Sequence, residues 1–118
     1  MLKRFTTRRM LPAIALTLVV GLTAPFAAAG QDAKKGEQVY AAQKCATCHS
    51  IAGKGKKTNP LDGVGAKLSA EDTKQWILDP KGMAAKAKST KKPPMAAKYG
   101  ALPAADVDAL VAYMQSLK

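Results

Sequence analysis

Both cysteines of the chain and its only histidine fall within five consecutive residues, Cys45-Ala46-Thr47-Cys48-His49. The spacing C-x-x-C-H is the attachment signal for c-type haem. Two intervening residues set both thiols along one edge of a planar group that carries two vinyl substituents. The adjacent histidine can then turn its imidazole to the iron from one side. The sequence therefore predicts one covalently bound haem c, held by a single short segment.

Other uses of the same three side chains are open at this stage. A C-x-x-C pair also serves in dithiol oxidoreductases of the thioredoxin type, although the βαβ pattern of that fold is absent. Zinc bound by Cys45, Cys48 and His49 would need a fourth ligand, and the sequence offers no obvious one. An exposed thiol redox switch is the remaining alternative.

Length and composition indicate one small domain. The chain has 118 residues and a net charge of +11, and 47% of its residues are hydrophobic. That apolar content argues against wholesale disorder. Two cysteines are too few for a multi-bridge disulfide scaffold, and one histidine is too few for the metal sites that need several imidazoles.

The segment 1–29 is typical of a secretory signal peptide. A basic start is followed by an apolar run of sixteen residues over 11–26, and then by Ala27-Ala28-Ala29. This order predicts cleavage near Ala29, a periplasmic location and no stable membrane insertion afterwards. An uncleaved membrane anchor is the alternative, although the run is short for a membrane-spanning helix.

The remaining segment, 30–118, has little material for a core. It carries 15 lysines against 8 acidic residues, for a net charge of +7, and it contains neither arginine nor phenylalanine. Only 19 of its side chains are large and apolar or aromatic. A domain of this size is already marginal in buried area. We expect a bound group to complete the core, and the chain without haem to be largely unfolded.

Helical patterns predict an all-α domain of three to four short helices with two long loops. The expected helices cover 32–44, from 70 to a stop at Pro80, and 103–117, and the loops cover 50–67 and 81–94. Ser69 is the expected cap of the second helix, with two acidic residues in its first turn. Gly36 is costly inside a helix, and together with Tyr40 it suggests the close approach of another helix.

Over 30–118 the chain resembles class I cytochrome c, the small bacterial monohaem type. The resemblance rests on the sequence CATCH at 45–49 and on Gly36…Tyr40 and Leu110…Tyr113, which resemble the helix-crossing contact of that family. The stretch Trp76-Ile77-Leu78-Asp79-Pro80 resembles the helix that covers the haem on the side of the sixth ligand. The resemblance implies the cytochrome c fold, with its helices wrapped around one covalently attached haem.

The same resemblance implies roles for individual residues. Cys45 and Cys48 would bond the haem, His49 would be the proximal iron ligand, and the carbonyl of Pro60 would accept a hydrogen bond from its imidazole. Met95 would be the sixth ligand, because the family places this methionine shortly before the last helix. Met83 stays open as an alternative ligand.

The roles of three further side chains are open. Met114 is the third methionine that competes as sixth ligand, but it lies on the apolar stripe of the last expected helix, which favours a place in the core. Trp76 and Tyr99 are expected to pack in the core, and the alternative for Trp76 is a place against the haem face or a contact of its N–H with a propionate.

The lysines form clusters at 54–57 and 86–92, with Lys98 nearby. They are either an ordinary solvated surface or a docking face for an acidic redox partner protein. Nucleic acid is a poor partner, because no arginine and no aromatic platform accompany the lysines. We expect a monomeric one-electron carrier rather than an enzyme. The alternatives are a haem enzyme or gas sensor with an open sixth site, and the dithiol oxidoreductase.

Overall fold

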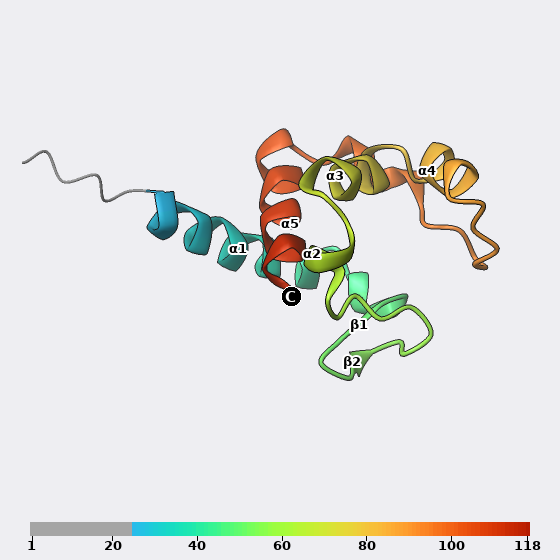
Figure 1. The fold of residues 1–118 in the computed structure, drawn as a ribbon, viewed down its shortest axis with the longest axis horizontal. Helices are drawn as coiled ribbons and strands as arrows, with labels where there is room; N and C mark the ends of the chain where they lie inside the picture. The colour runs from blue at the N-terminus through green and yellow to red at the C-terminus, as the bar shows by residue number, and fades with distance from the viewer. Residues whose placement is uncertain (1–24) are drawn as a thin grey trace, which may run out of the picture.

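The computed structural model describes the backbone of residues 25–118 and the side chains from Asp32 onward. Among these residues five α-helices dominate: α1 (Pro25–Ala42), α2 (Val64–Lys67), α3 (Ala70–Leu78), α4 (Pro80–Lys86) and α5 (Ala104–Ser116). Two 3₁₀ turns, η1 (Cys45–Thr47) and η2 (Ala97–Ala101), and a hairpin of β1 (Ser50–Ile51) and β2 (Lys54–Gly55) complete it. The predicted all-α architecture is confirmed (Figure 1).

The first and last helices cross at Gly36, which is buried. A Cβ atom on this residue would overlap the carbonyl oxygen of Ala109 in α5, so only glycine lets the two backbones approach this closely. Beside the crossing, the rings of Tyr40 and Tyr113 meet edge to face, with centroids 5.8 Å apart. Lys35 and Asp106 form an ion pair at 3.1 Å. The expected close approach of a second helix at Gly36 is confirmed.

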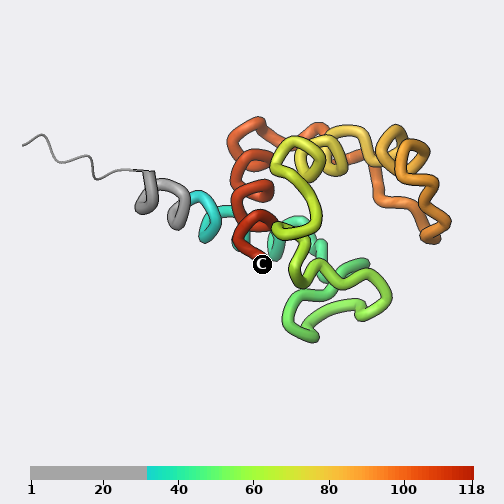
Figure 2. The backbone as a smooth tube through the Cα atoms, in the orientation of Figure 1, coloured from blue at the N-terminus to red at the C-terminus, as the bar shows by residue number. Residues whose placement is uncertain are grey.

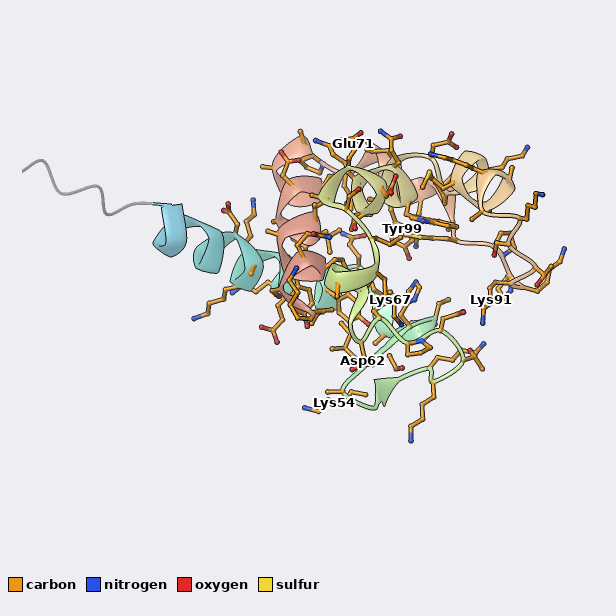
Figure 3. All side chains as sticks on the ribbon, viewed as in Figure 1. Lys54, Asp62, Lys67, Glu71, Lys91 and Tyr99 are labelled. Atoms are coloured by element: carbon orange, nitrogen blue, oxygen red, sulfur yellow. The ribbon has the colours of Figure 1, made fainter. Side chains whose placement is uncertain are left out.

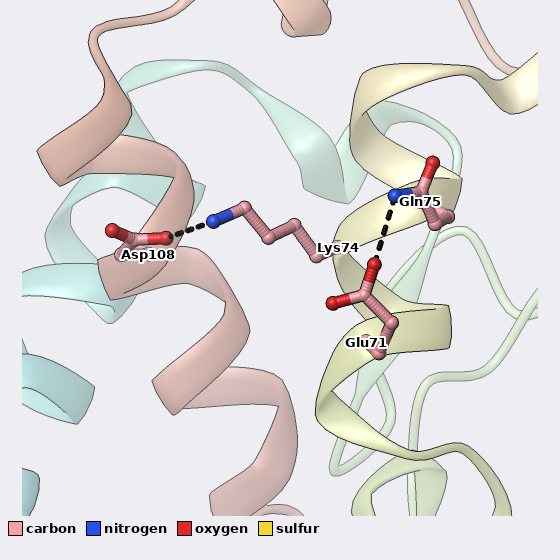
Figure 4. Close-up of polar contacts among 4 residues, drawn as sticks. All are labelled: Glu71, Lys74, Gln75 and Asp108. Atoms are coloured by element: carbon pink, nitrogen blue, oxygen red, sulfur yellow. Dashed lines mark hydrogen bonds and ion pairs between the residues drawn. The ribbon is translucent and has the colours of Figure 1, made fainter.

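Helix α3 begins where its cap predicts. The backbone N–H of Asp72 donates to the hydroxyl oxygen of Ser69 at 3.0 Å, which satisfies one of the free amides of the first turn. Lys74 donates to Asp108 of α5 at 2.8 Å, and within α3 Gln75 donates to Glu71 at 2.9 Å (Figure 4). The bond of Lys74 joins α3 to α5.

Two parts of the loop predictions are wrong. Pro80 ends α3 and also opens α4, because proline fits the first position of a helix. Asp79 caps α4: the backbone N–H of Gly82 donates to its carboxylate at 3.0 Å. The expected loop over 81–94 therefore starts only after Lys86. Figure 2 shows the chain leaving α4 in an extended excursion before it returns to η2.

The expected loop over 50–67 also contains regular structure. Ala52 and Gly53 both have positive φ, 51° and 77°, which is the requirement of the tight two-residue turn that joins hairpin strands. The turn pairs Ile51 with Lys54. Helix α2 follows Gly63, which has φ 72°. Local turn chemistry thus overrides the low propensity of a segment rich in glycine and lysine.

The end of the chain holds α2 in place. The side-chain amide of Gln115 donates to the carbonyl of Leu68 at 3.0 Å and to the hydroxyl of Thr73 at 3.1 Å. Lys118 donates to the carbonyl of Gly65 at 2.9 Å. Since Leu68 and Thr73 lie on either side of the turn into α3, these bonds join α2, α3 and α5.

The buried core is small and lies mostly on α5. Its apolar members have at most 9% of their surface exposed: Val39, Ile77, Val107, Ala109, Leu110, Val111 and Met114. No helix among the described residues is long and apolar enough to cross a membrane. The predicted signal peptide and its alternative, a membrane anchor, lie mostly outside the described residues.

Candidate cofactor site

A cavity lies beside the small core. Side chains from α1, η1, α2, α3, η2 and α5, and from the loops that connect them, form its wall. Its volume is about 750 Å³, including space open to solvent. The lining residues are Tyr40, Cys45, His49, Leu61, Val64, Leu68, Thr73, Trp76, Ile77, Met95, Tyr99, Leu110 and Met114. The wall is thus apolar apart from a few polar groups, as expected of a cofactor pocket.

The C-x-x-C-H segment forms one tight turn at the edge of this cavity. Lys44 has φ 56° and ends α1, and the backbone amides of Cys48 and His49 both donate to the carbonyl of Cys45, at 3.1 and 3.0 Å. Cys45 and His49 line the cavity, whereas Cys48 is exposed on the turn. No disulfide joins Cys45 to Cys48, and burial raises the pKa of the Cys45 thiol.

The imidazole of His49 is oriented by a backbone carbonyl. Its Nδ1 lies 3.1 Å from the carbonyl oxygen of Asn59. A carbonyl can only accept, so Nδ1 carries the proton and Nε2 keeps a free lone pair. This is the arrangement of a histidine prepared to bind a metal through Nε2.

The acceptor is Asn59, and the expectation that Pro60 would supply this carbonyl is wrong. Ser50 forms a parallel bridge with Pro60. In that register the flanking groups make the bonds: Ser50 N–H donates to Asn59 at 3.3 Å, and Leu61 N–H donates to Ser50 at 2.8 Å. The carbonyl that faces His49 is therefore that of the residue before the proline.

The three methionines considered as sixth ligand have different surroundings. Met95 is half-buried, lines the cavity and packs against the core cluster. Met83, on α4, is half-buried but is not part of the cavity lining. Met114 is buried in the core and also contributes to the wall. Met95 and Met114 are thus the methionines of the described residues that reach the cavity.

The aromatic side chains Trp76 and Tyr99 both line the cavity, which favours their contact with a bound group over simple core packing. The ammonium of Lys98 lies 5.1 Å from the ring centroid of Tyr99, as in a cation–π pair. This lysine therefore stands at the rim of the cavity.

The sequence analysis missed two polar wall residues. The hydroxyl of Tyr40 is buried without a hydrogen-bond partner. Burial, followed by the nearby Cys45, Tyr113 and Asp62, raises the pKa of Tyr40 to about 12. Thr73 is also buried, and its position three residues before Trp76 on one helix is a signal that could have identified it.

The comparison with family models gives one result that decides the family. The cytochrome c family model matches residues 33–118, well over half of the chain. The chain belongs to the cytochrome c family. A search of curated proteins and a search of solved structures each returned no significant match. The cytochrome c fold and the resemblance predicted from the sequence are therefore confirmed.

This cytochrome c domain is a haem-based electron carrier, and its cofactor is covalently attached haem c. The residues of the cavity fit that group: a thiol, a correctly oriented imidazole and a thioether face an otherwise apolar space, with a second thiol on the same turn. Among the described residues, no group of three or more His, Cys, Asp or Glu side chains is placed to hold a metal ion.

Proposed function

We propose that this cytochrome c is a periplasmic one-electron carrier, with His49 and Met95 as the axial ligands of a haem attached to Cys45 and Cys48. Bound haem supplies the change between Fe(II) and Fe(III). The observation that carries the proposal is the convergence of His49 and Met95, which are 46 positions apart in sequence, on the wall of one apolar cavity. A carrier needs both axial positions filled, so that no substrate reaches the metal and the geometry changes little between oxidation states.

The protein's own residues set the properties of such a site. The carbonyl of Asn59 fixes the proton on Nδ1 of His49 and makes Nε2 a better donor. Met95 offers a neutral sulfur, which favours the reduced form relative to an anionic ligand. The apolar wall limits the access of water to a bound group, and this further stabilises the less charged oxidation state.

The proposed partner is an acidic redox protein. Between Pro80 and Pro103 the chain carries six lysines and no acidic residue, and three more lysines lie over 54–57. Figure 3 shows Lys54 on the hairpin and Lys91 on the excursion after α4, with Tyr99 of the cavity wall above both in this view. Asp62 lies beside the hairpin, where it accepts from the backbone N–H of Ala52 at 2.7 Å. Six other acidic residues lie on α1, α3 and α5: Asp32, Glu37, Glu71, Asp72, Asp106 and Asp108. The excess of positive charge on the lysine-rich segments steers an acidic partner toward the rim of the cavity and allows fast release.

The periplasmic location rests on the features of residues 1–29 and on the family, since covalent haem attachment belongs to exported domains in bacteria. The domain itself has no further substrate in this proposal. It exchanges one electron with each partner in turn.

The decisive experiment is the alkaline pyridine spectrum of the protein purified from a host able to attach haem covalently. We expect the spectrum of a haem bound through two thioethers, and a colourless preparation would overturn the proposal. Met95→Ala should then abolish the Fe–Met charge-transfer absorption, whereas Met83→Ala should keep it. If Met95→Ala keeps that absorption, Met95 is not the ligand.

A further inference from the structure

The segment that carries Met95 has little to hold it against the rest of the domain. Residues 87–94 are exposed one after another, and Met95 is the first half-buried residue that follows them. We call residues 87–96 the Met95 strap. At its start the backbone amides of Ala87, Lys88 and Ser89 donate back to α4, and within the strap the backbone amide of Lys91 donates to the hydroxyl of Ser89 at 3.3 Å. An exposed segment with so few contacts opens at low energetic cost.

One side chain of the strap reaches across to the other side of the cavity. The ammonium of Lys91 donates to the carbonyl oxygen of Thr58 at 3.4 Å. Within the described part of the chain, this is the hydrogen bond that joins the strap to a segment other than α4 or the strap itself. Thr58 directly precedes Asn59, the residue that orients His49. The bond therefore links the loop behind one proposed ligand to the strap that carries the other.

We propose that Lys91 is a positioning residue, which clasps the Met95 strap to the Thr58 loop and so keeps Met95 in the cavity. This inference rests on the proposed His49/Met95 ligation and extends it to the control of ligand loss. We call the Lys91–Thr58 hydrogen bond the clasp, and it opposes a repulsion between positively charged side chains. The strap and the segment 54–57 are both rich in lysine and contain no acidic residue, so without a specific contact their charges favour separation.

The specificity of the clasp lies in the donor rather than in the charge. Lys92 is the next residue, is equally exposed and has no hydrogen bond to the Thr58 loop. Removal of its charge should lower the repulsion between the two segments and leave the clasp intact. Removal of Lys91 deletes the bond as well as a charge. The two substitutions therefore separate a bridging role from a purely electrostatic one.

The test measures how easily an external ligand displaces Met95 in the holoprotein. Imidazole is titrated into the ferric form of the wild type, Lys91→Gln, Lys91→Arg and Lys92→Gln, with the Fe–Met absorption as the signal. A long, exposed hydrogen bond of this kind contributes at the low end of the usual range, so we expect Lys91→Gln to bind imidazole about two- to threefold more tightly than the wild type. Lys91→Arg should restore the wild-type affinity, because it keeps a long cationic donor. Lys92→Gln should bind imidazole no more tightly than the wild type.

Each outcome has a distinct meaning. If Lys91→Gln and Lys92→Gln give the same affinity, or if Lys91→Arg behaves like Lys91→Gln, the clasp is refuted. Thermal unfolding of the four proteins should coincide, and a loss of stability confined to Lys91→Gln would also count against a local clasp. Met95→Ala serves as the reference for the ligation itself, and its imidazole binding is followed by the shift of the main haem absorption band instead of the Fe–Met absorption. If its imidazole affinity equals that of the wild type, the proposed function fails, and the result for Lys91 is separate from that failure.

Discussion

Substitution of Gly36 by alanine should destabilise the protein, although the same change in an ordinary helix stabilises it. Alanine is favoured over glycine in a helix interior by about 1 kcal/mol. Here the new Cβ atom would overlap the backbone carbonyl of Ala109 and would lie 2.6 Å from the Cβ of Tyr113. A backbone carbonyl cannot rotate away, so α1 and α5 must separate, and overpacking of this kind costs about 3 kcal/mol at the upper end of its range. The net loss is about 2 kcal/mol.

The assay is thermal unfolding of the haem-loaded protein, followed by far-ultraviolet dichroism and by haem absorption. For a domain of this size, about 2 kcal/mol corresponds to a fall in Tm of roughly 8–16 °C. Gly82→Ala is the comparison variant, because its Cβ would meet the carboxylate of Asp79, which is a flexible side chain. That carboxylate caps α4, and loss of the cap costs about 1 kcal/mol, which the higher helix propensity of alanine offsets. Gly82→Ala should therefore be close to neutral. Ala109→Gly should not rescue Gly36→Ala, since the obstacle is a main-chain oxygen. A Gly36→Ala variant as stable as the wild type would refute the close crossing.

Three further outcomes are expected. The double variant Cys45→Ala/Cys48→Ala should lose most of its helical dichroism, because the small core leaves a cavity; native-like helicity would contradict this. Burial raises the pKa of Tyr40 from 10 to about 12, so the folded state holds this proton more tightly than the unfolded state does. The corresponding stability is present below pH 10 and is lost as the pH rises to 12. In chemical unfolding, Tyr40→Phe should therefore lose less stability than the wild type over that interval. Lys98→Gln should slow electron transfer to an acidic partner at low salt more than Lys34→Gln does, and stopped-flow rates should converge near 1 M salt, where the screening length is about 3 Å.

The sequence predicted those features whose cause is local. Three such features each follow from a short pattern, and the structure confirms them: the cap at Ser69, the apolar stripe of the last helix, and the close approach of a second helix at Gly36. Helix α4 was missed because Asp79-Pro80 has two meanings. Proline ends the preceding helix and is equally suited to open the next one when an aspartate stands before it.

The wrong expectation for Pro60 has a different cause, which is the register in which the loop pairs with Ser50. Whether Asn59 or Pro60 presents its carbonyl to His49 depends on how the loop pairs with Ser50, and a shift of one residue changes the answer. The contribution of Tyr40 and Thr73 to the cavity depends on the angles between helices. No pattern within a single segment contains that information.

The crossing at Gly36 also bears on when the molecule can assemble. The helix that leads into the haem-binding turn finds its partner only in α5, a segment far from it in the sequence. A chain still emerging from a ribosome or a translocation channel lacks the counterpart of α1 until α5 has emerged as well. Closure between such distant segments is slow relative to local helix formation. We therefore expect the thiols of the haem-binding turn to stay accessible until α1 and α5 meet.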